Sequence, residues 1–174
     1  MRIYQPAEDS FLLDEFLDKY LKNHKVETYL DMGTGSGILS VTALKYLEKK
    51  NVLAVDINPR AVKQLVDRGY YVIQSDFFEK IDGKFDLITF NAPYLPLDKR
   101  EPLDSQVATT GGKRGDESSL RFLKQSRKHL NVGGKIFLLV SSLTPMDKLR
   151  KYKPKAVAKR RVFMEELIVY EIIF

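Results

Sequence analysis

The sequence contains no cysteine and only two histidines, His24 and His129. The absence of cysteine excludes disulfide bonds, a cysteine nucleophile and a thiolate metal site, and two histidines argue against a zinc site. Long hydrophobic runs are also missing: the longest, Ile136–Val140, is far short of the roughly 20 residues that cross a bilayer. No apolar segment of the signal-peptide kind follows Met1–Pro6. We therefore expect a cytoplasmic protein with no metal site and no membrane span.

Positive charge is concentrated near the end of the chain. Lysine and arginine total 29 against 23 acidic residues, which gives a net charge of +6. The stretch Lys148–Arg161 holds eight basic residues and no acidic one, so the rest of the chain has a net charge of −2. Such a stretch could contact RNA, the ribosome or an acidic partner. A solvated connection between two strands would have the same composition, so both interpretations stay open.

The apolar pattern predicts one α/β domain over residues 1–174, because 44% of the residues are hydrophobic and strands alternate with helices. Helices are expected over Ala7–Leu21, Ser36–Lys49, Pro59 to Gly69 and Asp116–Leu130. Strands are expected over Glu27–Asp31, Val52–Val55, Tyr70–Gln74, Phe85–Phe90 and Lys135–Ser141. Two further strands in Ala156–Phe174 meet near Glu165 and Glu166, and such close neighbours must be antiparallel. This is a doubly wound, Rossmann-like sheet with an antiparallel terminal hairpin, which binds ligands beyond the carboxyl ends of its strands.

A glycine-rich turn, Asp31–Gly37, follows the first strand. Gly33, Gly35 and Gly37 allow the backbone to approach a ligand closely, but their G-x-G-x-G spacing differs from the G-x-G-x-x-G dinucleotide fingerprint. Asp31 at the mouth of the turn would repel a pyrophosphate and attract an ammonium group. S-adenosylmethionine carries that ammonium and a sulfonium, and has no phosphate.

Acidic residues also follow the second and third strands. Asp56, beside Ile57, lies 19 residues after Gly37, where an acid can accept hydrogen bonds from both ribose hydroxyls. Asp76 could accept a hydrogen bond from an adenine amino group, with Phe77 beside the ring. Either acid alone could be a helix N-cap. Together with Asp31 they predict a site for an adenosine with a cationic tail.

The turn Asn91-Ala92-Pro93-Tyr94 follows the fourth strand and is the candidate catalytic segment. It resembles the [Asn/Asp]-Pro-Pro-[Tyr/Phe] motif of methyltransferases that act on amide or exocyclic amino nitrogens. The Asn91 side-chain oxygen and the Ala92 carbonyl can accept the two hydrogens of such a nitrogen, and Tyr94 can stack on the planar group. Alanine replaces the first proline, but Pro93 still keeps residue 92 extended.

Taken together, the chain resembles the class I S-adenosylmethionine-dependent methyltransferases, and among them the short eukaryotic and archaeal branch of the HemK family. The residues that carry the resemblance are Tyr4–Ser10, Asp31–Gly37, Asp56–Pro59, Asn91–Tyr94 and the glycine loop Thr110–Gly115. The resemblance implies the strand order 3-2-1-4-5-7-6 and an N-terminal helix, within residues 1–22, that covers the cofactor. It also implies that Ser10 and the acids beside it close over the cofactor, and that the loop Leu95–Gly115 admits the substrate.

The resemblance further implies a substrate and a partner. The methyl acceptor would be the side-chain amide of the glutamine in the Gly-Gly-Gln motif of a peptide-chain release factor. A small zinc-ribbon activator protein would form a heterodimer with the chain along the third strand, residues 70–74, which is an edge of the implied sheet.

Three other functions stay open at this point. The same catalytic motif methylates adenine N6 in DNA or RNA, although 174 residues leave no room for a separate target-recognition domain. A protein-lysine methyltransferase is a second alternative. The third, a non-catalytic S-adenosylmethionine-binding or RNA-binding scaffold, would lose no activity on substitution of Asn91.

Overall fold

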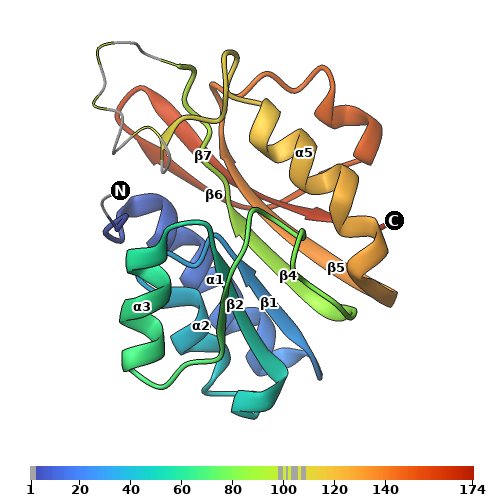
Figure 1. Cartoon of the computed structure of the whole chain (residues 1–174). Coiled ribbons are helices and arrows are strands. Elements are labelled where there is room, and N and C mark those ends of the chain that lie inside the picture. The colour runs from blue at the N-terminus through green and yellow to red at the C-terminus, as the bar shows by residue number, and fades with distance from the viewer. Residues whose placement is uncertain (1–2, 98–99, 101, 103–105, 107–108) are drawn as a thin grey trace.

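A seven-stranded mixed sheet organises the protein (Figure 1). The computed structural model describes residues 3–97, 100, 102, 106 and 109–174. The strand order β3-β2-β1-β4-β5-β7-β6 confirms the sequence-based expectation and makes β3 and β6 the two edges. Parallel pairing joins β1 (Tyr29–Met32), β2 (Val52–Asp56), β3 (Val72–Gln74), β4 (Phe85–Asn91) and β5 (Leu130–Ser141). Antiparallel pairing adds β7 (Glu165–Ile172) to β5, and β6 (Lys155–Val162) to β7.

Helices cover both faces of this sheet (Figure 1). Alternate residues of β5 point to opposite faces, as strand geometry requires. Phe137 packs in one apolar cluster with α1 (Glu8–Asn23) and α2 (Ile38–Ala43), and Leu138 packs in the other with α5 (Glu117–Ser126). In the part of the chain that the structure describes, no helix is long and apolar enough to cross a membrane.

The connection from β2 into α3 (Pro59–Asp67) is fixed by local sequence. The Asn58 side chain caps the helix by accepting the N–H of Arg60 at 3.0 Å, and Pro59 occupies the first turn. Gly69, with φ +80°, follows the helix as the sequence predicts. The cap holds Asp56 and Ile57 at the carboxyl edge of the sheet.

Several element boundaries differ from the expected ones. The helix expected over Ser36–Lys49 is only α2, because the N–H groups of Lys45 and Tyr46 bond to carbonyls three residues back and end the α-helical pattern. The helix expected over 116–130 ends at Ser126 and continues as a 3₁₀ turn over 127–129. Strand β5 starts at Leu130 rather than Lys135, since Leu130 pairs with Phe85 ahead of a bulge. Strand β3 starts at Val72, two residues later than expected.

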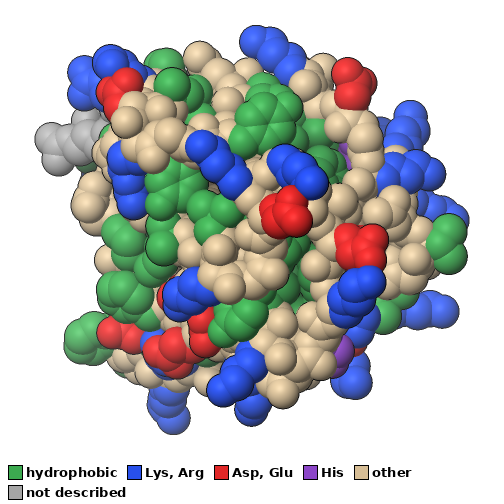
Figure 2. All heavy atoms as spheres, turned by 90° about the horizontal axis from the view of Figure 1, so that it is seen from below, with side chains coloured by type: hydrophobic (Ala, Val, Ile, Leu, Met, Phe, Trp, Pro, Cys, Tyr) green, Lys and Arg blue, Asp and Glu red, His purple; other side chains and the backbone are tan. Residues whose placement is uncertain are grey.

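The basic stretch 148–161 is not a simple connection between strands. It contains the 3₁₀ turn Leu149–Tyr152 and most of the edge strand β6. Arg160 forms ion pairs with Glu8 at 3.2 Å and Glu15 at 2.8 Å, so it ties β6 to α1. Figure 2 shows basic side chains spread over the face seen from below, among acidic and hydrophobic ones. Contact of this stretch with RNA or the ribosome stays a prediction.

Candidate active site

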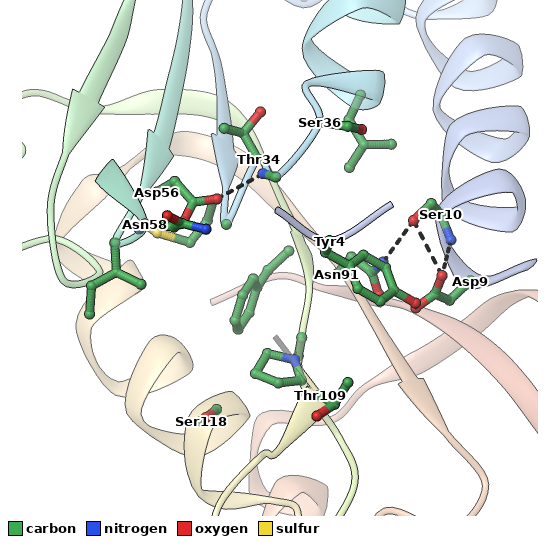
Figure 3. Close-up of a pocket in the computed structure, with 18 of the residues that line it drawn as sticks. Tyr4, Asp9, Ser10, Thr34, Ser36, Asp56, Asn58, Asn91, Thr109 and Ser118 are labelled. Atoms are coloured by element: carbon green, nitrogen blue, oxygen red, sulfur yellow. Dashed lines mark hydrogen bonds between the residues drawn. The ribbon is translucent and has the colours of Figure 1, made fainter. Parts of the chain in front are cut away.

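A pocket of about 320 Å³ opens at the carboxyl ends of the parallel strands (Figure 3). This is the edge at which doubly wound sheets bind their ligands. Eleven of the thirteen predicted site residues line it: Ser10, Gly33, Gly35, Asp56, Ile57, Asp76, Phe77, Asn91, Ala92, Pro93 and Tyr94. Asp31 and Gly37 are not among the lining residues. Among the described residues, no three histidine, aspartate or glutamate side chains gather to form a metal site.

The glycine turn forms one wall of the pocket. Gly33 and Gly35 line it with φ values of +65° and +54°, a conformation that favours glycine. The N–H of Gly35 donates to Asp56 Oδ2 at 2.8 Å, which joins the ends of β1 and β2. Gly37 lies behind the wall, where a Cβ would come within 2.6 Å of Leu65 Cδ2. Glycine at this position therefore leaves room for the Leu65 side chain of α3.

Asp31 is fully buried beneath the glycine turn, whereas the sequence placed it at the mouth. Its Oδ2 accepts hydrogen bonds from the hydroxyls of Thr34 and Ser40, each at 2.7 Å. Its Oδ1 is buried with no hydrogen-bond partner among the described residues. Burial raises the pKa of Asp31 to about 6. A nearby cation would favour the ionised form of this carboxyl group.

Asp31 gives the stability of the protein a testable pH dependence. Its pKa rises from 3.8 to about 6 in the folded state, so the folded protein binds this proton more tightly than the unfolded chain does. This contribution to the free energy of unfolding is present below about pH 4 and is lost as the pH rises through about 6. Relative to the wild type, Asp31→Asn should therefore gain roughly 2 kcal/mol between pH 4 and pH 7. Urea denaturation of both proteins at the two pH values measures this, and a difference independent of pH would contradict it.

Asp56 lies at the end of β2 and is 8% exposed. Its Oδ1 accepts the N–H of Asn58 at 2.8 Å, and burial raises its pKa. Each carboxylate oxygen has further lone pairs, so both can also accept a ligand hydroxyl. Ile57, which is 42% exposed, offers an apolar surface beside this acid.

Asp76 and Phe77 are positioned by a residue that the sequence analysis missed. Arg121 of α5 donates to both carboxylate oxygens of Asp76, at 3.0 and 2.9 Å, and to Glu79 at 3.0 Å. Its guanidinium also lies 4.9 Å from the centre of the Phe77 ring. Phe77 has a φ of +49°, an uncommon conformation that turns its ring toward Phe90. No local sequence signal connects Arg121 to Asp76, because 45 residues separate them.

The catalytic turn presents an unused hydrogen-bond acceptor. Asn91 Nδ2 donates to the hydroxyl of Ser10 at 3.3 Å, which fixes the orientation of the amide (Figure 3). Asn91 Oδ1 is buried and has no hydrogen-bond partner among the described residues. Tyr94 is half-buried, and burial together with the charges of Asp9 and Glu165 raises its pKa, so its hydroxyl stays protonated.

The N-terminal segment completes the pocket. Asp9 accepts the Tyr4 hydroxyl at 2.9 Å and the Ser10 N–H at 2.6 Å, so Tyr4 and the start of α1 are joined (Figure 3). Tyr4, Asn58 and Ser118 also line the pocket and were not predicted as site residues, and Thr109 lines it from the loop predicted to admit substrate. Tyr4 lay inside the segment that carries the family resemblance, which was a usable signal.

The glycine loop packs against the catalytic turn. The N–H of Gly111 donates to the Leu95 carbonyl and the N–H of Leu97 donates to the Gly112 carbonyl, each at 2.9 Å. A Cβ on Gly111 would lie 2.5 Å from the Pro93 carbonyl oxygen and would overlap the Gly115 carbonyl. Glycine is therefore required at position 111, because the neighbouring backbone leaves no room for a side chain. The segment predicted to admit substrate, Leu95–Gly115, lies partly outside the described residues.

Gly111→Ala should displace the catalytic turn without touching the cofactor-binding strand ends. We expect the turnover number to fall by about 10-fold to 100-fold, because small displacements of reacting groups have large effects on rate. The dissociation constant for S-adenosylhomocysteine should stay within about twofold. Steady-state kinetics and calorimetry measure the two quantities. Gly83→Ala is the control for backbone strain alone, since Gly83 has a φ of +98° but a Cβ on it meets nothing within 4 Å.

Comparison with known proteins identifies the family. Residues 10–163 match the methyltransferase small domain family. The chain belongs to this family. The methyltransferase is 39% identical over 181 residues to a Methanocaldococcus jannaschii protein provisionally named as a protein N5-glutamine methyltransferase, covering 96% of the chain and 89% of that protein. It is 28% identical over 151 residues to the mouse protein named methyltransferase HEMK2, covering 79% of the chain and 71% of that protein.

A third relative is longer than the chain. The release factor glutamine methyltransferase of Rhodopirellula baltica is 34% identical over 160 residues, which cover 80% of the chain and 53% of that protein. The methyltransferase therefore spans about half the length of this relative.

Solved structures show the same fold. The ribosomal protein L11 methylase of Lactobacillus delbrueckii has a TM-score of 0.65 at 22% identity, covering 98% of the chain and 81% of that protein. A methyltransferase of Pyrococcus furiosus has a TM-score of 0.63 at 20% identity, covering 98% and 87%.

The methyl donor of this class I methyltransferase is S-adenosylmethionine, with S-adenosylhomocysteine as the product. The pocket residues fit this cofactor. Gly33 and Gly35 present backbone without side chains to the pocket, and Asp56 has acceptor capacity for ribose hydroxyls. The unpartnered oxygen of Asp31 lies under the same turn and could stabilise a cationic tail through it.

Proposed function

We propose that the methyltransferase methylates the side-chain amide nitrogen of the glutamine in the Gly-Gly-Gln motif of a peptide-chain release factor. The observation that carries this proposal is the hydrogen bonding of the Asn91 side chain. Its Nδ2 is held by Ser10, while its buried Oδ1 has no partner among the described residues. A buried acceptor left unpaired is unfavourable, so a ligand N–H that pairs with it gains more than an exposed contact would.

The geometry suits a planar amide. Asn91 Oδ1 and the Ala92 carbonyl would accept the two amide hydrogens, which fixes the nitrogen in the pocket. The half-buried Tyr94 ring would stack on the amide plane, and its raised pKa keeps it neutral. Bound S-adenosylmethionine supplies an electrophilic methyl group on its sulfonium. The chain itself needs only to orient the nitrogen, and the surplus proton can leave after transfer.

The names of relatives support glutamine as the acceptor. The Methanocaldococcus jannaschii relative carries protein N5-glutamine in its name, and the Rhodopirellula baltica relative carries release factor glutamine. Since the latter is about twice as long, the release factor as substrate of this chain rests on the proposal rather than on similarity alone.

Transfer of labelled methyl groups tests the proposal. The enzyme is incubated with labelled S-adenosylmethionine and, separately, a release factor, histone, tRNA and DNA. We expect label in the release factor, mapped to the Gly-Gly-Gln glutamine, and loss of label when that glutamine is changed to alanine. Label in nucleic acid would instead identify an adenine N6-methyltransferase, and label on lysine a protein-lysine methyltransferase. No label in any acceptor would favour a non-catalytic scaffold.

We also propose that a small zinc-ribbon protein pairs with the edge strand β3. The strand ends the sheet, and Tyr71 beside it is 52% exposed, as is Val66 of α3. An edge with exposed apolar neighbours is suited to a partner that covers it.

Substitution at this edge tests the pairing. Tyr71→Asp should prevent co-purification of the methyltransferase with a co-expressed zinc-ribbon protein, because a charge replaces the exposed aromatic surface. Val132→Asp, at a fully exposed apolar residue of β5, should leave co-purification unchanged. Retention of the partner by Tyr71→Asp would contradict the assignment.

A further inference from the structure

The β6–β7 hairpin ends in two large hydrophobic residues that are almost fully exposed. Phe163 and Met164 form its turn, and each is 94% exposed. They therefore add nothing to the hydrophobic core. Exposed neighbouring side chains of this size are typical of surfaces that bind another molecule.

The turn conformation makes this choice of residues more unusual. Phe163 has a φ of +49°, in the left-handed region that favours glycine and asparagine. In a two-residue hairpin turn whose first residue alone has a positive φ, glycine is the common choice at that position. Folding alone would favour glycine there, so a bulky apolar pair in this conformation points to function.

The hairpin turn lies at the same edge of the sheet as the pocket. Leu167 of β7 pairs with Ser141 at the carboxyl end of β5, and Val162 pairs with Glu165, so the turn extends beyond that edge. Figure 1 shows β6 and β7 reaching the end of the sheet where α1 begins. Glu165, next to the turn, bonds to the Ser141 hydroxyl, and its charge contributes to the raised pKa of Tyr94 in the pocket.

A third exposed residue is held beside this turn. Leu143 is 57% exposed and follows β5. The N–H of Ser142 donates to the Glu166 carbonyl at 2.7 Å, and the N–H of Glu166 donates to the Ser142 hydroxyl at 2.9 Å. These bonds fix the segment that carries Leu143 against the base of the hairpin.

We propose that Phe163 and Met164, with Leu143, dock the protein that carries the methyl acceptor. We call these three residues the docking tip. The inference rests on the proposed function and adds where the folded substrate binds outside the pocket. A protein surface is the expected occupant because the docking tip is apolar, whereas the phosphates of a nucleic acid bind to cations. Basic residues of β6 also stand near the turn, but Arg160 is paired with Glu8 and Glu15, and Lys159 with Glu166.

The test removes the apolar side chains and keeps the turn. The double variant Phe163→Gly with Met164→Asn places glycine at the position with positive φ, so its melting temperature should equal or exceed that of the wild type. With intact release factor as substrate, we expect KM to rise about tenfold and kcat to stay unchanged, because the docking tip touches no reacting atom. The dissociation constant for S-adenosylhomocysteine should also be unchanged. Val132→Asn is the matched control, since Val132 is a fully exposed apolar residue near the start of β5.

The outcomes separate this inference from the function on which it rests. An unchanged KM in the double variant would overturn the proposal that the docking tip binds the substrate protein. A fall in kcat with KM unchanged would overturn it as well. A wild-type enzyme that methylates nucleic acid but no release factor would overturn both the proposed function and the docking tip. A tenfold rise in KM that Val132→Asn does not reproduce would support it.

Discussion

Asn91→Ala is expected to reduce methyl transfer by about 100-fold to 1,000-fold, the range found when one preorganised hydrogen-bonding group is removed from an active site. The variant loses the buried Oδ1 that we assign to the acceptor amide. The pocket wall formed by the glycine turn is untouched, so the dissociation constant for S-adenosylhomocysteine should change by less than about threefold. Single-turnover kinetics with labelled cofactor and calorimetry give the two quantities.

Two further variants sharpen this result. Asn23→Ala removes an exposed asparagine at the end of α1 and should leave the transfer rate unchanged. Ser10→Ala removes the hydroxyl that holds Asn91 Nδ2, so it should lower the rate less than Asn91→Ala does. A transfer rate near wild type in Asn91→Ala would contradict the catalytic assignment and favour a scaffold.

Asp56→Ala should have the largest effect on cofactor binding. Hydrogen bonds from buried hydroxyls to a carboxylate are strong, so we expect the affinity for S-adenosylhomocysteine to fall about 100-fold, or ~3 kcal/mol. Part of this loss of affinity comes from lost hydrogen bonds within the protein, because Asp56 also accepts the N–H groups of Gly35 and Asn58. Calorimetry with S-adenosylhomocysteine measures the change.

A conservative variant of Asp56 distinguishes hydrogen bonds to the ligand from hydrogen bonds that support the neighbouring loops. Asp56→Asn keeps one acceptor oxygen and should bind more tightly than Asp56→Ala but less tightly than the wild type. Asp82→Ala changes an exposed aspartate after β3 and serves as the control for charge. If Asp56→Ala binds S-adenosylhomocysteine with wild-type affinity, Asp56 does not bind the ribose hydroxyls.

Local sequence patterns were sufficient to predict the sheet and most of the residues that line the pocket. Strand and helix periodicity depends on neighbouring residues, so the alternation of elements could be predicted from the sequence. Residues directly after parallel strands meet at one edge, which is why Asp56, Asp76 and Asn91 were placed correctly in the pocket. Boundaries were less predictable, because the end of α2 and the start of β5 depend on hydrogen bonds with competing partners.

The sequence by itself determined the strand-to-helix alternation, the glycine turn and the residues that follow each strand. Only the tertiary structure decided how those residues are oriented and buried. Ser10 reaches Asn91 across 81 positions in the chain and Arg121 reaches Asp76 across 45. Asp31 became a buried residue beneath its turn because α2 packs over it. Such contacts form only when the sheet brings distant segments together, since no short-range pattern specifies which long side chains then lie within hydrogen-bonding distance.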